Sequence, residues 1–230
     1  MTTPTYEDGI AKVALRGVRG MIADKMQKSL LEAAQLTHHA SCNATNLLAA
    51  KARYAEAGTK VSIEDLLMQV VTEVLQRHPD INGTVEGKEV HLAEAVHLSV
   101  AMALPGNLLV APAIFDAQVK DIQGLREARQ DLSARAKTNK LSVTEMTGGT
   151  FTVSNLGLTR VHYFTPILNT PQIGILGIGC TEMKPVATED GSYRMAPHIG
   201  LSLTFDHRAI DGAPAAEFLT DVCTSIEDLK

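Results

Sequence analysis

The sequence predicts a single α/β domain in which helices flank a largely β chain. Some segments place apolar residues at helical spacing, and others alternate apolar and polar residues as strands do. No internal repeat or low-complexity linker interrupts the 230 residues, a length at which about 70–75% of the unfolded surface can be buried. We therefore expect a polar leader over residues 1–15 and one domain over residues 16–230.

The N-terminal third is predicted to hold three helices and one strand. Thr45 follows an alternating segment and is placed to cap a helix. Ser62 and Asp65 have the spacing of a capping box, and Pro79 closes the helix that they open. The expected elements are helices over 18–34, 45–57 and 62–77 and a strand over 37–45.

The rest of the chain is predicted to be mostly strands. Residues 82–92 are typical of a hairpin that turns at Glu86-Gly87-Lys88, and Ser142 can cap one short helical turn. Further strands are expected over 95–104, 108–115, 150–155, 173–182 and 195–204, and helices over 121–137 and 213–229.

Composition and charge exclude several classes of function. Lys and Arg number 21 against 26 Asp and Glu, and no basic block is present, so we expect neither a nucleic-acid partner nor a membrane surface. No apolar run approaches the about 20 residues of a membrane span, and no secretory signal begins the chain. Cys42, Cys180 and Cys223 are far apart and odd in number, which is typical of buried thiols in a reducing, intracellular compartment.

His207 is the first candidate for chemistry, because it follows an apolar strand in the segment Asp206 to Gly212. A neutral imidazole held at a strand end can act as a general base toward a thiol or hydroxyl. The loop is entered from an apolar strand and left by an apolar helix, so we expect it to be rigid and partly buried. Asp211 could orient the imidazole, but we favour a structural ion pair, with Arg19 as the candidate partner.

Ser154 is the second candidate, at the end of the strand predicted over 150–155. Its hydroxyl could satisfy the backbone of a turn or donate to a developing oxyanion. No G-x-S-x-G elbow surrounds it, so we interpret Ser154 as a stabiliser and not a nucleophile. His38 and His39 are neighbours on a strand and point to opposite faces, so no shared metal is expected.

Six segments together resemble the catalytic domain of the dihydrolipoamide acyltransferases of 2-oxo acid dehydrogenase complexes, which is similar to chloramphenicol acetyltransferase. The resemblance spans about residues 15–219 in consistent order, and its most specific segment is Asp206–Gly212, which looks like D-H-R-x-x-D-G. The other five are 19–26 (R-x-x-I-A-x-x-M), 79–82 (P-x-x-N), 106–117 (G-L-V-V-P-V-I-x-D-A), 148–157 (G-G-T-F-T-I-S-N-L-G) and 165–172 (T-P-I-I-N-P-P-Q).

This resemblance implies a mixed β-sheet flanked by helices, a chloramphenicol acetyltransferase-like fold, and homotrimers with active sites between subunits. It implies that His207 deprotonates the attacking thiol, that Ser154 of the neighbouring subunit hydrogen-bonds the oxyanion, and that Asp211 is structural. The reaction moves an acyl group between S-acyldihydrolipoamide and coenzyme A. Both are substrates, no metal is needed, and the residues that hold CoA are left unassigned. The location implied is the cytoplasm, or the mitochondrial matrix in a eukaryote.

Four features depart from the family pattern. The chain has no lipoyl domain and no domain for binding other complex components, so it is an excised fragment or receives its lipoyl arm from another chain. It lacks the family's apolar C-terminal tail, which predicts a trimer that forms the large cage poorly or not at all. The stretch 159–162 replaces one that often contains glycine, and Thr37-His38 stands where Pro-His is common.

Two other functions stay open beside the lipoamide acyltransferase. One is a stand-alone CoA-dependent acyltransferase with another acceptor, and the other is a non-catalytic scaffold homologue. The acyl group is also open, although Ser154-Asn155-Leu156-Gly157 looks more like the acetyl and branched-chain members than the succinyl type, which tends to have T-N-G-G.

Overall fold

The computed structural model describes residues 6, 8–106 and 108–230. Its α-helices are α1 (Gly17–Glu32), α2 (Thr45–Glu56), α3 (Ile63–Arg77), α4 (Ile122–Lys137), α5 (Val143–Thr147) and α6 (Gly212–Glu227), and its 3-10 helices are η1 (Pro79–Ile81) and η2 (Ala117–Val119). Its strands are β1 (Gln35–Asn43), β2 (Gly83–Glu86), β3 (Glu89–Leu92), β4 (Leu98–Val100), β5 (Met102–Leu104), β6 (Leu108–Val110), β7 (Ala113–Ile114), β8 (Phe151–Asn155), β9 (Gly174–Ala187) and β10 (Tyr193–Asp206).

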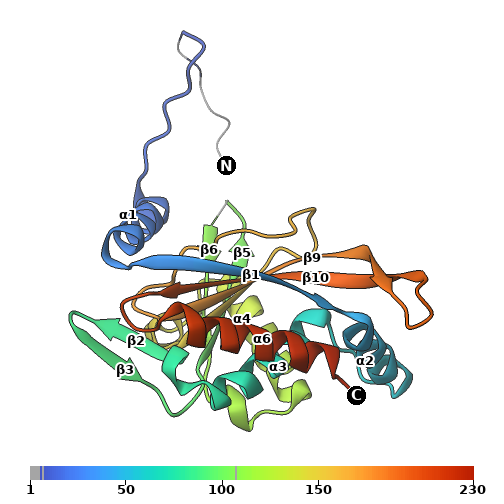
Figure 1. Cartoon of the computed structure of the whole chain (residues 1–230). Helices are drawn as coiled ribbons and strands as arrows, with labels where there is room; N and C mark the ends of the chain where they lie inside the picture. Colours follow the sequence, from blue (N-terminus) through green and yellow to red (C-terminus); the bar gives the residue numbers. More distant parts are fainter. Residues whose placement is uncertain (1–5, 7, 107) are drawn as a thin grey trace.

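A mixed sheet forms the centre of the molecule, with strand order β1-β10-β9-β8-β4-β7. β8 runs parallel to both β4 and β9, and the other neighbours are antiparallel. Helices α3, α4 and α6 lie along one face of this sheet (Figure 1). The prediction of a mixed sheet flanked by helices is therefore confirmed.

The main core lies between the sheet and this helix layer. Phe151 on β8, Phe205 on β10 and Phe218 on α6 are fully buried in it. α3 begins with the predicted capping box, in which Ser62 Oγ accepts a hydrogen bond from the backbone N–H of Asp65 and the Asp65 carboxylate accepts one from Ser62. The buried Asp65 also accepts a hydrogen bond from Arg129 Nε at 2.7 Å, which joins α3 to α4.

The predicted cap of α2 is wrong. The helix includes Thr45, and its N-cap is Ala44, which makes no side-chain cap hydrogen bond. Asn43 caps the start of the helix instead. Its Oδ1 accepts hydrogen bonds from the backbone N–H of Thr45 at 2.9 Å and from the Thr45 hydroxyl at 2.6 Å. An asparagine one residue before the N-cap thus supplies the acceptor expected of the threonine.

The two strands predicted over 95–104 and 108–115 are each broken in two. β4 and β7 belong to the central sheet, whereas β5 and β6 form a separate hairpin. Pro112 lies between β6 and β7, and proline has no N–H to continue a ladder. Its carbonyl instead accepts a hydrogen bond from Val100 at 3.0 Å.

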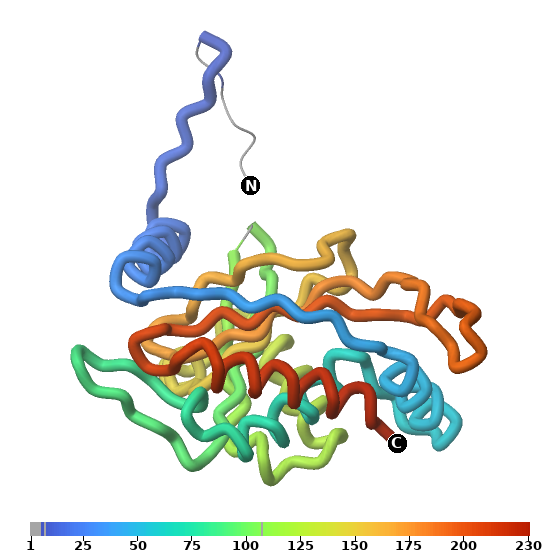
Figure 2. The backbone as a smooth tube through the Cα atoms, in the orientation of Figure 1, coloured from blue at the N-terminus to red at the C-terminus, as the bar shows by residue number. Residues whose placement is uncertain are grey.

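β9 and β10 are longer than predicted. They continue as a two-stranded ribbon past the ends predicted at residues 182 and 195, and its tip projects from the body of the molecule (Figure 2). Within the sheet, the glycines of β9 make room for the segment that crosses them. A Cβ at Gly177 would lie 2.7 Å from Phe164 Cζ, and one at Gly179 would collide with the backbone carbonyl of His162.

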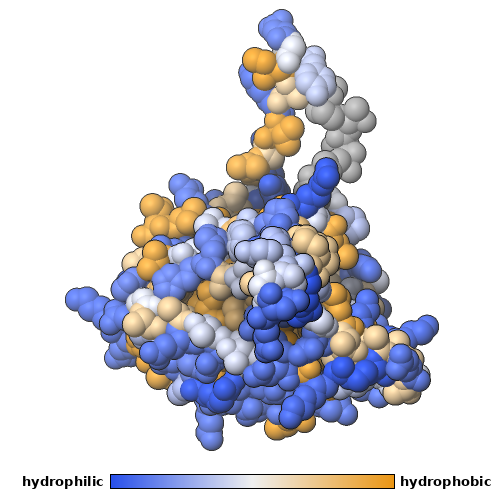
Figure 3. Space-filling model, turned by 45° about the vertical axis from the view of Figure 1, so that its right-hand side comes forward, coloured by the Kyte–Doolittle hydropathy of each residue, from blue (hydrophilic) through white to orange (hydrophobic). Residues whose placement is uncertain are grey.

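α1 stands apart from the helix layer and carries exposed apolar side chains. Val18, Leu30 and Leu31 are 49%, 56% and 78% exposed. Further apolar side chains gather along the extended segment that precedes α1 and rises from the body (Figure 3). In the part of the chain that the structure describes, no helix is long and apolar enough to cross a membrane.

Candidate active site

The loop that carries His207 is fixed by the buried carboxylate of Asp206. That carboxylate accepts hydrogen bonds from the backbone N–H groups of Ala34 and Arg208, and from the Arg208 guanidinium with Nη2 at 2.6 Å. The backbone N–H of His207 donates to the Ala34 carbonyl at 2.9 Å. Since Asp206 and Ile210 are buried, the expectation of a partly buried loop is confirmed, and its rigidity stays a prediction.

Replacing Asp206 with alanine is expected to lower the free energy of unfolding by about 3 kcal/mol, because four N–H donors lose a shared acceptor. Burial alone would raise the pKa of Asp206, but hydrogen bonds from Arg208 and its charge outweigh burial and hold that pKa below 3.8. A depressed pKa gives stability above the ordinary pKa and loses it as the pH falls. Urea unfolding should therefore show the full difference at pH 7 and a smaller one below pH 3.8. An equal difference at all pH values would contradict the charge assignment.

The side chains of His207 and Asp211 are exposed, at 42% and 86%. His207 Nδ1 lies 3.6 Å from Asp211 Oδ1, which is beyond hydrogen-bond length. Asp211 is the N-cap residue of α6 but makes no side-chain cap hydrogen bond. The structure thus brings these two predicted residues together, while the ion pair of Asp211 with Arg19 stays a prediction.

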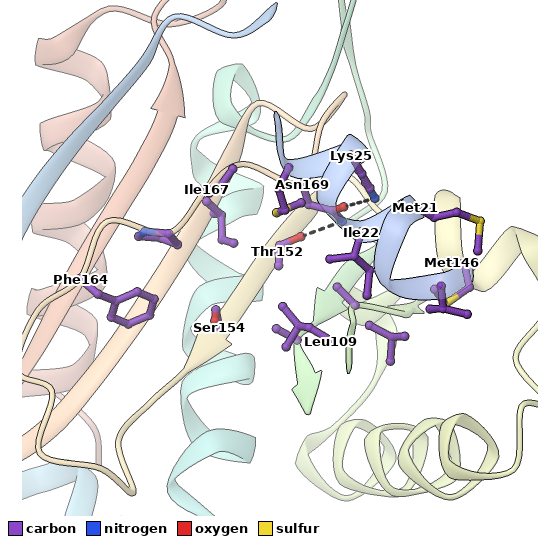
Figure 4. Close-up of a pocket in the computed structure, with 17 residues that line it drawn as sticks. Met21, Ile22, Lys25, Leu109, Met146, Thr152, Ser154, Phe164, Ile167 and Asn169 are labelled. Atoms are coloured by element: carbon purple, nitrogen blue, oxygen red, sulfur yellow. Dashed lines mark hydrogen bonds between the residues drawn. The ribbon is translucent and has the colours of Figure 1, made fainter. Parts of the chain in front are cut away.

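Ser154 lies on β8, at the wall of a cavity of about 450 Å³ (Figure 4). The walls of this cavity come from α1, β6, β8 and the segment that crosses β9, and they are mostly apolar. An apolar site strengthens any hydrogen bond made inside it. The cavity residues labelled in Figure 4 are Met21, Ile22, Lys25, Leu109, Met146, Thr152, Ser154, Phe164, Ile167 and Asn169.

A chain of polar side chains runs along one wall of the cavity. Lys25 Nζ donates to Asn169 Oδ1 at 2.6 Å, and Asn169 Nδ2 donates to Thr152 Oγ1 at 3.4 Å. Thr152 in turn donates to the buried Gln172, whose Nε2 donates to Ser99 Oγ at 3.2 Å. The sequence predicts no role for these residues, and only the motif over 165–172 points toward Asn169 and Gln172.

The fold does not bring Ser154 and His207 of one chain together. Ser154 pairs with Gly177 on β9, and Gly177 pairs with Ser202 on β10. His207 follows Ser202 by five residues, which is about 17 Å along a strand. His207 is also absent from the walls of the cavity. A site that uses both side chains needs two chains.

The fold places a histidine on a loop after one central strand and a serine on another. Residues 7–230 match the family described as 2-oxoacid dehydrogenases acyltransferase (catalytic domain). The chain belongs to this family.

Curated relatives agree with the family match. The chain is 36% identical to the dihydrolipoyllysine-residue acetyltransferase component of the acetoin cleaving system of Bacillus subtilis, over 98% of the chain and 57% of that protein. It is 32% identical to a probable mitochondrial dihydrolipoyllysine-residue succinyltransferase component of the 2-oxoglutarate dehydrogenase complex of Schizosaccharomyces pombe, over 94% of the chain and 50% of that protein. The chain thus spans about half the length of these curated relatives.

Solved structures show the same fold. A probable dihydrolipoamide acetyltransferase from Listeria monocytogenes superposes with a TM-score of 0.89 at 28% identity, covering 97% of each chain. The dihydrolipoamide acetyltransferase of Azotobacter vinelandii superposes with a TM-score of 0.87 at 29% identity, covering 96% of this chain and 92% of that one. Chloramphenicol acetyltransferase, at 16% identity, has a TM-score of 0.56 over 90% and 93% of the two chains. The predicted chloramphenicol acetyltransferase-like fold is confirmed.

Proposed function

We propose that this chain is the acyltransferase core that moves an acyl group between S-acyldihydrolipoamide and CoA. The observation that carries the proposal is the family match over residues 7–230, in a chain that keeps His207 on a fixed loop and Ser154 in an apolar cavity. The relatives support it, since they are named as dihydrolipoyllysine acetyltransferases and succinyltransferases.

His207 is proposed as the general base, Ser154 of a neighbouring subunit as the oxyanion donor, and Asp211 as a structural residue. The Azotobacter vinelandii enzyme supports catalytic roles for His207 and Ser154. Its catalytic mechanism was studied at a serine, a histidine 52 residues later and an asparagine four residues after that. Here Ser154 precedes His207 by 53 residues and Asp211 follows by four, so an aspartate takes the place of the asparagine.

The mechanism follows from these roles. The imidazole of His207 takes the proton of the attacking thiol, and the thiolate adds to the thioester carbonyl. The Ser154 hydroxyl donates to the oxygen that becomes negative in the tetrahedral intermediate, where the bond is strongest. Collapse breaks the other carbon–sulfur bond, and the leaving thiolate recovers the proton from His207. Holding thiol, thioester and base together supplies much of the remaining rate.

A homotrimer is the proposed assembly, because each site needs His207 from one chain and Ser154 from the next. The solved relatives include the cubic core of a pyruvate dehydrogenase multienzyme complex, which supports association with other 2-oxo acid dehydrogenase components. The lipoyl arm would come from another chain or from a segment outside these residues. The proposed location is the cytoplasm, or the mitochondrial matrix in a eukaryote.

The test is acyl transfer from acetyl-, succinyl- and isobutyryl-CoA to free dihydrolipoamide. We expect turnover with at least one donor, followed as loss of the thioester. If a folded trimer transfers no acyl group to dihydrolipoamide but acylates another thiol, hydroxyl or amine, the chain is a CoA-dependent acyltransferase with another acceptor. If it transfers none to any acceptor, it is a non-catalytic scaffold.

A further inference from the structure

One positively charged side chain lines the described part of the cavity beside Ser154. Among its 17 described lining residues, only Lys25 carries a charge, and the others are apolar or neutral. Lys25 comes from α1, whereas Ser154 comes from β8 in the central sheet (Figure 4). A charge beside apolar walls attracts a group of opposite charge when a ligand excludes water from the cavity.

Lys25 has no such partner in the part of the chain that the structure describes. Its one hydrogen bond there goes to the neutral Asn169 Oδ1, and no carboxylate forms an ion pair with it. A lysine ammonium has three N–H donors, so two remain for a ligand. Lys25 is exposed to solvent in the single chain, and partial desolvation against the cavity wall lowers its pKa.

The ammonium is oriented by its hydrogen bond to the half-buried Asn169, which a buried neighbour holds in turn. The side-chain oxygen of Asn169 accepts a hydrogen bond from Lys25, and its nitrogen donates one to Thr152. The amide group of Asn169 is therefore held in one orientation. Thr152 and Gln172 are 1% and 4% exposed, and their hydrogen bonds continue to Ser99 inside the core. A donor held in place by locked neighbours is typical of a site built to bind.

The cavity connects Ser154 to this cation. Thr152 and Ser154 are two residues apart on β8, so they face the same side of the sheet about 7 Å apart. Figure 4 shows Ser154, Thr152, Asn169 and Lys25 in that order across the cavity. A thioester whose carbonyl oxygen meets Ser154 can thus extend its acyl chain toward the ammonium.

We propose that the cavity accepts the acyl group of a dicarboxylic acid monothioester, such as a succinyl group, and that Lys25 binds its free carboxylate. This inference rests on the proposed acyl transfer. It differs from the sequence pattern of Ser154 to Gly157, which looks more like the acetyl and branched-chain members of the family. Neutral acyl groups leave the ammonium unpaired, whereas a terminal carboxylate supplies a charge-assisted hydrogen bond.

The experiment compares succinyl-CoA with isobutyryl-CoA, whose acyl groups have the same number of carbons but differ in charge. The readout is the ratio of kcat/KM for the two donors, with free dihydrolipoamide as acceptor. We expect the wild-type chain to favour succinyl-CoA and Lys25→Met to lower the ratio by about 10- to 100-fold. Lys25→Arg should recover much of it. Lys28→Met, one turn away and 69% exposed, should leave the ratio unchanged.

The outcomes separate the inference from the function on which it rests. Turnover of acetyl- or isobutyryl-CoA without succinyl-CoA would overturn the inference and leave the acyltransferase intact. If Lys25→Met lowers kcat/KM equally for both donors, Lys25 contacts a part of the substrate that both donors share. That result would also overturn the inference. Transfer from no donor would instead refute the proposed function. If Lys25→Met fails to form a trimer in sedimentation, Lys25→Gln replaces it.

Discussion

Alanine in place of His207 is expected to lower kcat/KM for acyl transfer by about 10²- to 10⁴-fold. The variant loses the group that takes the proton from the attacking thiol, and at neutral pH a thiol with an ordinary pKa is mostly protonated. The fold should survive, because the His207 side chain is 42% exposed and its loop is fixed by Asp206. The measurement is the steady-state rate with CoA thioester and dihydrolipoamide, recorded from pH 6 to pH 9.

The control for this variant is His91→Ala. His91 lies on β3 with a side chain that is 50% exposed, and its removal should leave activity unchanged. Activity of His207→Ala within a fewfold of wild type would remove His207 from the mechanism. Partial recovery at high pH, where the thiol ionises without help, would support the role as a base.

Two inactive variants are expected to restore one another inside mixed trimers. Ser154→Ala should lower the rate by about 10²- to 10³-fold, as the loss of one oxyanion donor does. Each site of the proposed trimer uses His207 from one chain and Ser154 from the next. Refolding equal amounts of His207→Ala and Ser154→Ala together should therefore leave about a quarter of the sites with both native side chains, and about a quarter of wild-type activity.

The same two variants refolded separately and then mixed are the control, and they should stay inactive. A site built within a single chain would give no recovery in the mixed trimers. That result would contradict the shared site. It would also contradict the strand register, in which His207 lies about 17 Å along the strand from Ser202, and Ser202 is two strands away from Ser154. Sedimentation of the mixture shows whether trimers formed at all.

Local patterns in the sequence predicted most of the fold. The capping box at Ser62 and the helix cap at Ser142 are confirmed, because each depends on residues three positions apart. The errors arose where partners are distant or where a neighbour takes over a role. Asn43 replaces Thr45 as the acceptor at α2, and Pro112 interrupts a strand whose apolar residues look continuous.

The candidate site was predicted unevenly for a similar reason. His207 and Ser154 stand in contiguous motifs that can be read directly from the sequence. Lys25 meets Asn169 across 144 residues, and nothing near either residue in the sequence indicates this contact. Whether Asp211 pairs with Arg19 also depends on packing that local spacing does not determine.

The apolar surface of α1 has a consequence for how the protein melts. Val18, Leu30 and Leu31 are largely exposed in the single chain. Covering such side chains with another molecule stabilises the folded state. This stabilisation belongs to the folded state alone, since an unfolded chain presents no organised surface. The melting temperature should therefore rise with the concentration of the protein, as it does when association and folding are linked.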